Sequence, residues 1–129
     1  MKTIDSLEEL NLPKKFINFL KKYLDNIANI NSIEKIILFG SCARGNAHDD
    51  SDIDLMIIGD GITENDENSI YVGCIPFVPQ SEYVVIDIFT STHKKYNIHK
   101  TQLGYIQPNI EREGIDLSQC INKQKDVIV

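Results

Sequence analysis

The chain has 129 residues, of which 42% are hydrophobic and 25% are charged, and this composition is typical of one globular domain. Thirteen basic and nineteen acidic side chains give a formal net charge of -6, which argues against sequence-independent binding of nucleic acid, because that binding depends on neutralising phosphates. The N-terminal stretch MKTIDSLEEL has no apolar core of signal-peptide length and no later run reaches the length of a membrane span, so we expect a cytoplasmic protein without direct contact to a membrane or to nucleic acid.

Apolar runs and helical patterns follow one another along the chain and predict an α/β fold, with a small mixed β-sheet flanked by helices. Apolar residues recur at three- and four-residue steps after Pro13 and indicate an amphipathic helix. Ile36 to Phe39 and Ile53 to Ile58 are continuous apolar runs, which are typical of strands covered on both faces. We predict a single domain over 1–129, with a helix at 13–30, a strand-turn-strand unit at 34–59, a variable loop at 60–82, a third strand at 83–89 and C-terminal helices at 91–117. Within the variable loop, the polar segment 62–69 is either exposed loop or a short helix.

Two aspartates stand one residue apart at the start of the second predicted strand. Asp52 and Asp54 project to the same side of an extended chain, about 6–7 Å apart. Two ionised carboxylates at this spacing repel each other, whereas a pair of divalent cations about 3.5–4 Å apart would remove the repulsion. Mg²⁺ fits best, because it is a hard ion that takes carboxylate and phosphate oxygens. Asp87 is the candidate third acid, since an aspartate inside VVIDIF is costly without a partner; the alternative is that it caps a turn at the end of the strand.

Gly40 and Ser41 end the first predicted strand and predict a phosphate-binding turn. Glycine lets the backbone approach a ligand closely, and the amides of a strand-to-helix turn point at whatever lies in front of them. The Ser41 hydroxyl adds a further donor. A Gly-Ser pair after a strand is common, so its meaning here comes from the two aspartates that follow at a fixed distance.

Gly40-Ser41, ten intervening residues and Asp52-Ile53-Asp54 resemble the G-S-x10-D-x-D signature of the DNA polymerase beta-like nucleotidyltransferase superfamily. The wider string LFGSCARGNAHDDSDIDLMII is similar to the small single-domain branch of minimal nucleotidyltransferases, the MntA-like antitoxins. The likeness extends from the preceding helix to Asp87 and to IEREGIDL near residues 110–117. The chain departs from this branch between Asp60 and Tyr83, where the segment is long and interrupted by prolines.

The resemblance implies a nucleotidyltransferase of the EC 2.7.7 class that uses two Mg²⁺ ions and ATP as nucleotide donor. Gly40 and Ser41 would bind the β- and γ-phosphates, Asp52 and Asp54 would bind the metals, and Asp87 would complete the metal site and help to deprotonate the attacking hydroxyl. In this family the acceptor of AMP is typically a tyrosine of a partner HEPN-domain toxin. The resemblance therefore implies an antitoxin that acts by AMPylation and forms a complex with its partner.

Several alternatives stay open. Arg44 either binds a phosphate oxygen of the nucleotide or pairs with an acid such as Asp52. The fold could mask a toxin by docking alone, without catalysis, and the acceptor could be a small molecule rather than a protein.

Other reactive side chains favour structural roles. The three cysteines lack a C-x-x-C pair, so we expect passive, semi-buried thiols at Cys42, Cys74 and Cys120. A polar loop is expected to be solvated, and it contains His48, Asp49 and Asp50. A basic helix is also expected to be solvated, although it could steer a nucleotide or a partner, and it carries His93, Lys94, Lys95, His99 and Lys100. An apolar segment could either bind a partner or pack under a loop, and it contains Ile70, Tyr71, Ile75, Phe77 and Val78.

Overall fold

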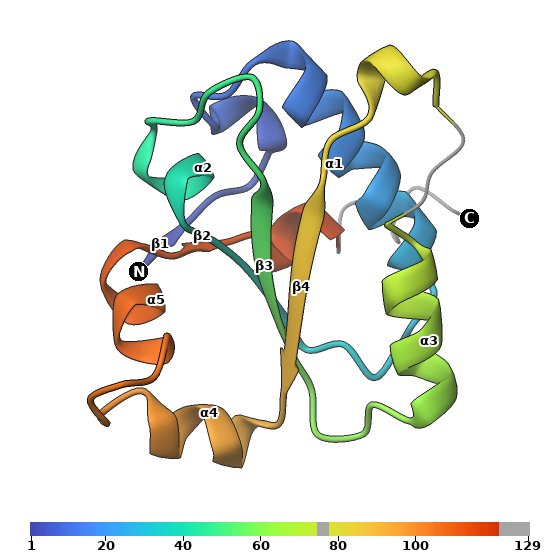
Figure 1. Cartoon of the computed structure of the whole chain (residues 1–129). Coiled ribbons are helices and arrows are strands. Elements are labelled where there is room, and N and C mark those ends of the chain that lie inside the picture. The colour runs from blue at the N-terminus through green and yellow to red at the C-terminus, as the bar shows by residue number, and fades with distance from the viewer. Residues whose placement is uncertain (75–77, 122–129) are drawn as a thin grey trace.

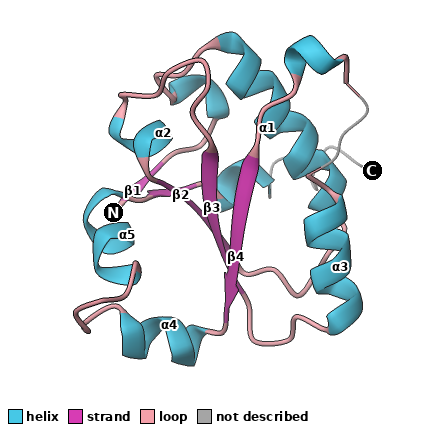
Figure 2. Cartoon of the chain, in the orientation of Figure 1, coloured by secondary structure: helices cyan, strands magenta, loops and turns pink. Residues whose placement is uncertain are grey.

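Five strands form one mixed sheet in the order β1-β5-β2-β3-β4, and helices cover it on both sides (Figures 1 and 2). The computed structural model describes residues 1–74 and 78–121. The strands are β1 Lys2–Thr3, β2 Lys35–Phe39, β3 Ile53–Ile58, β4 Ile86–Ser91 and β5 Ile115–Asp116. Strand β3 is antiparallel to β2 and parallel to β4, which lies at the edge of the sheet. The predicted α/β fold with a small mixed sheet is confirmed.

The helices include two short 3-10 turns. Their bounds are η1 Leu7–Glu9, α1 Lys14–Ile27, α2 Ser41–Arg44, α3 Glu64–Val72, η2 Gln80–Glu82, α4 His93–His99 and α5 Gln107–Glu113. Helix α1 lies within the predicted segment 13–30, with Pro13 as its N-cap. Helices α4 and α5 lie within the predicted segment 91–117, and Gly114 follows the end of α5. Among the described residues, no helix combines the length and the apolar character needed to cross a membrane.

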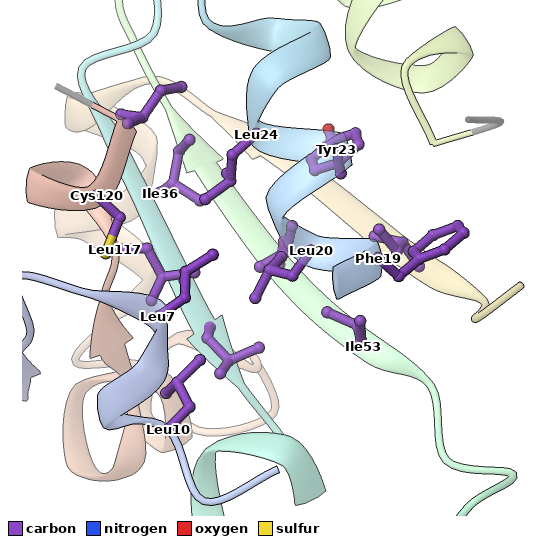
Figure 3. Packing of buried hydrophobic residues seen from close by; sticks show 14 of the residues in the cluster. Leu7, Leu10, Phe19, Leu20, Tyr23, Leu24, Ile36, Ile53, Leu117 and Cys120 are labelled. Atoms are coloured by element: carbon purple, nitrogen blue, oxygen red, sulfur yellow. The ribbon is translucent and has the colours of Figure 1, made fainter. Parts of the chain in front are cut away.

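The apolar stripe of α1 packs against the centre of the sheet. Leu20 and Leu24 have no exposed surface and face Ile36 of β2 and neighbouring strand residues (Figure 3). The hydroxyl of Tyr23, also buried, donates a hydrogen bond of 3.1 Å to the carbonyl of Ile70 in α3. Burial of these side chains supplies the main stabilisation of the fold, and the Tyr23 bond fixes α3 beside α1 on the same face.

Alternating residues of β3 divide the sheet into two differently covered faces. Ile53, Leu55 and Ile57 belong to the large core cluster under α1, whereas Met56 and Ile58 belong to a smaller cluster on the other face. Tyr96 of α4 and Ile110 of α5 complete this smaller cluster. Because successive side chains of a strand point to opposite faces, Asp54 shares the face of Met56. We call this face, which carries the smaller cluster, the acid-bearing face.

The predicted loop at 60–82 contains a helix. Helix α3 begins at a capping box in which the Thr63 hydroxyl accepts the Asp66 N–H at 3.1 Å and the Asp66 carboxylate accepts the Thr63 N–H at 3.2 Å. These reciprocal bonds satisfy amides that a helix start leaves unpaired. The structure thus has the short helix that the sequence left open for 62–69, extended to Val72, and buried Ile70 joins this helix to the core.

Three further boundaries differ from the sequence prediction. Strand β4 runs over Ile86–Ser91 rather than 83–89. Tyr83 is the C-cap of η2 and packs edge-on against Phe19, with ring centroids 5.2 Å apart. Strand β5 follows α5 within the segment predicted as helices, and β1 precedes the first predicted element. Two-residue strands carry no periodic pattern, so only the pairing with a neighbouring strand defines them.

Candidate active site

Parallel pairing of β3 and β4 brings the predicted acids together. Asp54 and Asp87 are register partners on adjacent strands, and Asp52 lies two residues before Asp54. All three therefore lie on the acid-bearing face at the same end of the two strands. Asp54 is half-buried, whereas Asp52 and Asp87 are exposed. The structure thus brings the three side chains to one end of the two strands, and their role as metal ligands stays a prediction.

The three carboxylates interact unfavourably with one another. Burial, together with the neighbouring charges of Asp87 and Asp52, raises the pKa of Asp54 to about 6. Partial desolvation and the adjacent Asp87 carboxyl also raise the pKa of Asp52. These shifts mean that the site disfavours three negative charges at neutral pH. A set of hard carboxylate oxygens that repel one another fits a divalent cation such as Mg²⁺, which would remove the repulsion.

The turn after β2 lies against Asp54, and its conformation favours glycine at position 40. Gly40 has φ 76° and ψ -157°, a conformation that is almost restricted to glycine. A Cβ atom at this position would lie 2.3 Å from Oδ2 of Asp54, well inside the contact distance. Within the described part of the chain, the amides of Ser41 and Cys42 donate to no protein acceptor. The backbone of the predicted phosphate turn therefore lies directly beside the acids, with two amides available to a ligand.

Cys42 connects this turn by a hydrogen bond to the segment that carries Asp52 and Asp54. Its thiol, which is buried, donates a hydrogen bond of 3.4 Å to the carbonyl of Asp52. Burial and the nearby Asp54 raise the pKa of this thiol to about 11, so the group stays neutral. The burial of Cys42 agrees with the predicted passive thiol, whereas its contact with Asp52 had no signal in the sequence.

Arg44, the last residue of α2, pairs with an acid other than the one considered from sequence. Its guanidinium donates a hydrogen bond of 3.1 Å to Glu113 of α5. The same positive charge lowers the pKa of Asp54, against the larger upward effects. Arg44 thus stands at the border of the acid site, and its contact with a phosphate oxygen stays a prediction.

The remaining candidate residues lie away from the acids or in exposed positions. His48, Asp49 and Asp50 are exposed in the loop before β3. His93, Lys94, Lys95 and His99 lie on α4, where the ring of His99 stacks on Tyr105 with centroids 4.0 Å apart. In the apolar segment, Ile70 is buried in the core and Tyr71 is exposed, while residues 75 and 77 lie outside the described residues.

A second cluster of titratable groups was missed by the sequence analysis. Glu34 precedes β2, Asp60 follows β3 and His93 opens α4, and one possible ligand atom of each lies within 4.8 Å of the others. Asp52, Asp54 and Asp87, although described, do not meet this spacing as a group of three. The three residues of the second cluster come from distant segments that only folding unites, so no local motif announces them.

Comparison with known proteins identifies related sequences. The family model described as "Nucleotidyltransferase domain" matches residues 13–117. Two proteins of Methanocaldococcus jannaschii, both named "Putative protein adenylyltransferase", are similar to this chain. The first is 52% identical over 48 residues, which are 36% of this chain and 42% of that protein, so the match spans less than half of the relative. The second is 29% identical over 120 residues, which are 89% of this chain and 98% of that protein.

A solved crystal structure of a "putative nucleotidyltransferase" from Sulfolobus solfataricus was also found. It superimposes with a TM-score of 0.45 and 22% sequence identity, over 63% of this chain and 70% of the other.

Proposed function

The chain belongs to the nucleotidyltransferase domain family of the DNA polymerase beta-like superfamily, and from this premise we propose that it transfers AMP from ATP to a hydroxyl group in a reaction that requires Mg²⁺. Membership of this family makes the chain a nucleotidyltransferase. The observation that carries the proposal is the position of three carboxylates beside a turn whose conformation is almost restricted to glycine.

The backbone amides and the carboxylates of the site have different roles in the proposed transfer. The free amides of Ser41 and Cys42 lie where they could hold the triphosphate oxygens, since Gly40 brings the backbone next to Asp54. Asp52, Asp54 and Asp87 would hold Mg²⁺, which supplies positive charge for the triphosphate and for the charge that develops during transfer.

In the proposed reaction the acceptor hydroxyl oxygen attacks the α-phosphorus of ATP. A new oxygen–phosphorus bond forms, the bond from the α-phosphorus to the bridging oxygen breaks, and pyrophosphate leaves on the opposite side. We assign the uptake of the hydroxyl proton to Asp87, because Asp87 is exposed on the edge strand, whereas Asp54 lies between it and the Gly40 turn.

We further propose that the acceptor is a tyrosine of a partner HEPN-domain toxin, so that the chain acts as an antitoxin. The names of the two relatives from Methanocaldococcus jannaschii support a protein acceptor over a small molecule. The net charge of -6 is consistent with a protein partner rather than with a nucleic acid.

Intact mass spectrometry tests the proposal. The protein is mixed with the product of the gene that neighbours its own, with ATP and Mg²⁺, and that product is expected to be a HEPN-domain protein that gains the mass of one or more AMP units. Asp52→Asn should lower the rate by at least about 100-fold, because a metal ligand is lost. Asp49→Asn changes an exposed acid three positions away and serves as the matched control.

Two results would contradict the proposal. One is the absence of any mass increase with each of the four nucleoside triphosphates. The other is an Asp52→Asn variant that modifies its partner as fast as wild type does. Inhibition of the toxin without a mass change would instead indicate masking by docking alone.

A further inference from the structure

Two phenylalanines lie against each other on the acid-bearing face. Phe39 ends β2 and Phe89 lies in the middle of β4, and their ring centroids are 5.7 Å apart with the planes tilted by 52°. Phe39 is the register partner of Asp54, and Phe89 follows Asp87 by two residues. Because residues two apart share a face of a strand, Phe89 and Asp87 project to the same side, about 6–7 Å apart along the chain.

Packing alone accounts for only part of this aromatic pair. The register partner of Phe89 on β3 is Met56, which is 2% exposed, so the rings help to cover this methionine. Nevertheless, 42% of Phe89 remains exposed, on a face where Asp87 and Asp52 are exposed as well. This open aromatic surface lies beside the carboxylates and would gain from contact with another apolar group.

The position of Phe89 favours contact with the acceptor over contact with the nucleotide. The free amides of Ser41 and Cys42 lie at the end of β2, and the order β2-β3-β4 puts Phe89 two strands away on the edge strand. In an in-line displacement the attacking oxygen and the leaving pyrophosphate lie on opposite sides of the phosphorus. With the phosphates held beside β2, the acceptor approaches from the side of β4, where Phe89 is exposed next to Asp87.

We propose that Phe89, supported by Phe39, is an aromatic platform that binds the ring of a tyrosine acceptor while its hydroxyl reaches Asp87. This inference rests on the proposed function and adds the residue that selects the acceptor. Aromatic pairs are stabilised when their ring centroids lie about 4.5–7 Å apart, and Phe89 projects from the same face as Asp87, two residues away on β4. A serine or threonine acceptor has no ring to place there, so the platform favours tyrosine.

Nuclear magnetic resonance of the whole chain tests the platform. The protein is saturated with Mg²⁺ and a non-hydrolysable ATP analogue and is then titrated with N-acetyl-tyrosinamide or with N-acetyl-serinamide. The tyrosine compound should shift the ring signals of Phe89 and Phe39, and the serine compound should not. Phe89→Leu should weaken binding of the tyrosine compound about tenfold, whereas Phe89→Trp should retain it because it keeps an aromatic face.

Tyr105→Leu provides the matched control, because Tyr105 is an aromatic residue of similar exposure, 48%, that stacks on His99 outside the sheet. It should bind the tyrosine compound as wild type does. The platform is refuted if the serine compound binds equally well, if Phe89→Leu retains full affinity, or if no ring signal moves. A shift of the Phe89 ring by the ATP analogue alone would assign the platform to the nucleobase and would also refute it.

The same titration keeps the two proposals apart. Binding of the ATP analogue is followed separately through the backbone amide signals of Ser41 and Cys42. If these signals do not respond to the analogue and Mg²⁺, the proposed function fails; if they respond and the tyrosine compound does not bind, only the platform fails.

Discussion

The two ends of strands β3 and β4 both carry clustered acids, and their surroundings differ. At the end beyond Ile58, the Glu34 carboxylate accepts the Asp60 N–H at 2.8 Å and lies 3.5 Å from Nε2 of His93, and the Asp60 carboxylate accepts the His93 N–H at 2.9 Å. At the end before Ile53, burial and the neighbouring Asp87 carboxylate raise the pKa of Asp54 and of Asp52.

This difference separates a structural cluster from a candidate catalytic one. The acids at the Glu34 end accept hydrogen bonds from backbone amides, which explains why acids occur there. Glu34, just before β2, accepts from the turn after β3, and Asp60 in that turn accepts from the first residue of α4. Among the described residues, no backbone amide donates to the carboxylate of Asp54, which lies half-buried against Gly40 and next to Asp87. The charge of Arg44 lowers the pKa of Asp54, but the upward effects are larger. Acids that the fold itself does not stabilise are the ones that indicate binding of a cation.

The largest effect is expected from Gly40→Ala. The new Cβ would clash with Oδ2 of Asp54, and the backbone would have to leave a conformation that is almost restricted to glycine. We expect a loss of about 2–4 kcal/mol in the free energy of unfolding and a loss of AMP transfer. Urea denaturation followed by circular dichroism, together with the mass assay, measures both.

Gly45→Ala is the control for this change. Gly45 also has a positive φ, 78°, but its Cβ would meet no atom within 4 Å. Gly45→Ala should therefore lower the free energy of unfolding by only about 1 kcal/mol, because of left-handed backbone strain, and should leave AMP transfer intact. Equal effects of the two substitutions would show that backbone strain, rather than proximity to Asp54, explains the glycine.

A smaller effect is expected from Asp54→Asn in the protein without Mg²⁺. The pKa of Asp54 is raised from 3.8 to about 6, so the folded state binds the proton more tightly than the unfolded state does. The stabilisation from this proton is full below pH 4 and is lost as the pH rises through 6. At pH 7.5 the variant should therefore be more stable than wild type by about 1–2 kcal/mol, a value reduced for solvent screening because Asp54 is only half-buried.

Urea denaturation of both proteins between pH 4 and 8 measures this difference. The advantage of Asp54→Asn should shrink toward pH 4, and Mg²⁺ should raise the stability of wild type at pH 7.5 more than that of the variant. An advantage independent of pH would show that repulsion among the carboxylates is not its cause.

The smallest effect is expected at the opposite end of the strands. Glu34→Gln keeps an oxygen that can accept the Asp60 N–H and removes only the attraction to His93, which is exposed to solvent. The free energy of unfolding should change by less than about 0.5 kcal/mol, and AMP transfer should be unchanged. A loss of transfer comparable to that of Asp52→Asn would contradict the division between the two ends.

Much of the candidate site was predictable because its signals are local. The spacing from Gly40 to Asp54 lies within one continuous stretch, and the apolar run of β3 sets which side chains share a face. Asp87 was found from its cost inside an apolar strand, although the strand begins three residues later than predicted. By contrast, the capping box of α3 was hidden in a polar segment, and Arg44 paired with Glu113 rather than with Asp52.

By itself the sequence determined the helix after Pro13, the strand at Ile53–Ile58 and the three acids, since periodicity and local cost depend only on neighbouring residues. Only the tertiary structure decided that Asp87 lies in register with Asp54, that Gly40 touches the carboxylate, and that Phe39 and Phe89 meet on the acid-bearing face. These relations depend on strand order and register, which arise from packing the whole sheet against its helices. No local stretch of the chain contains that information.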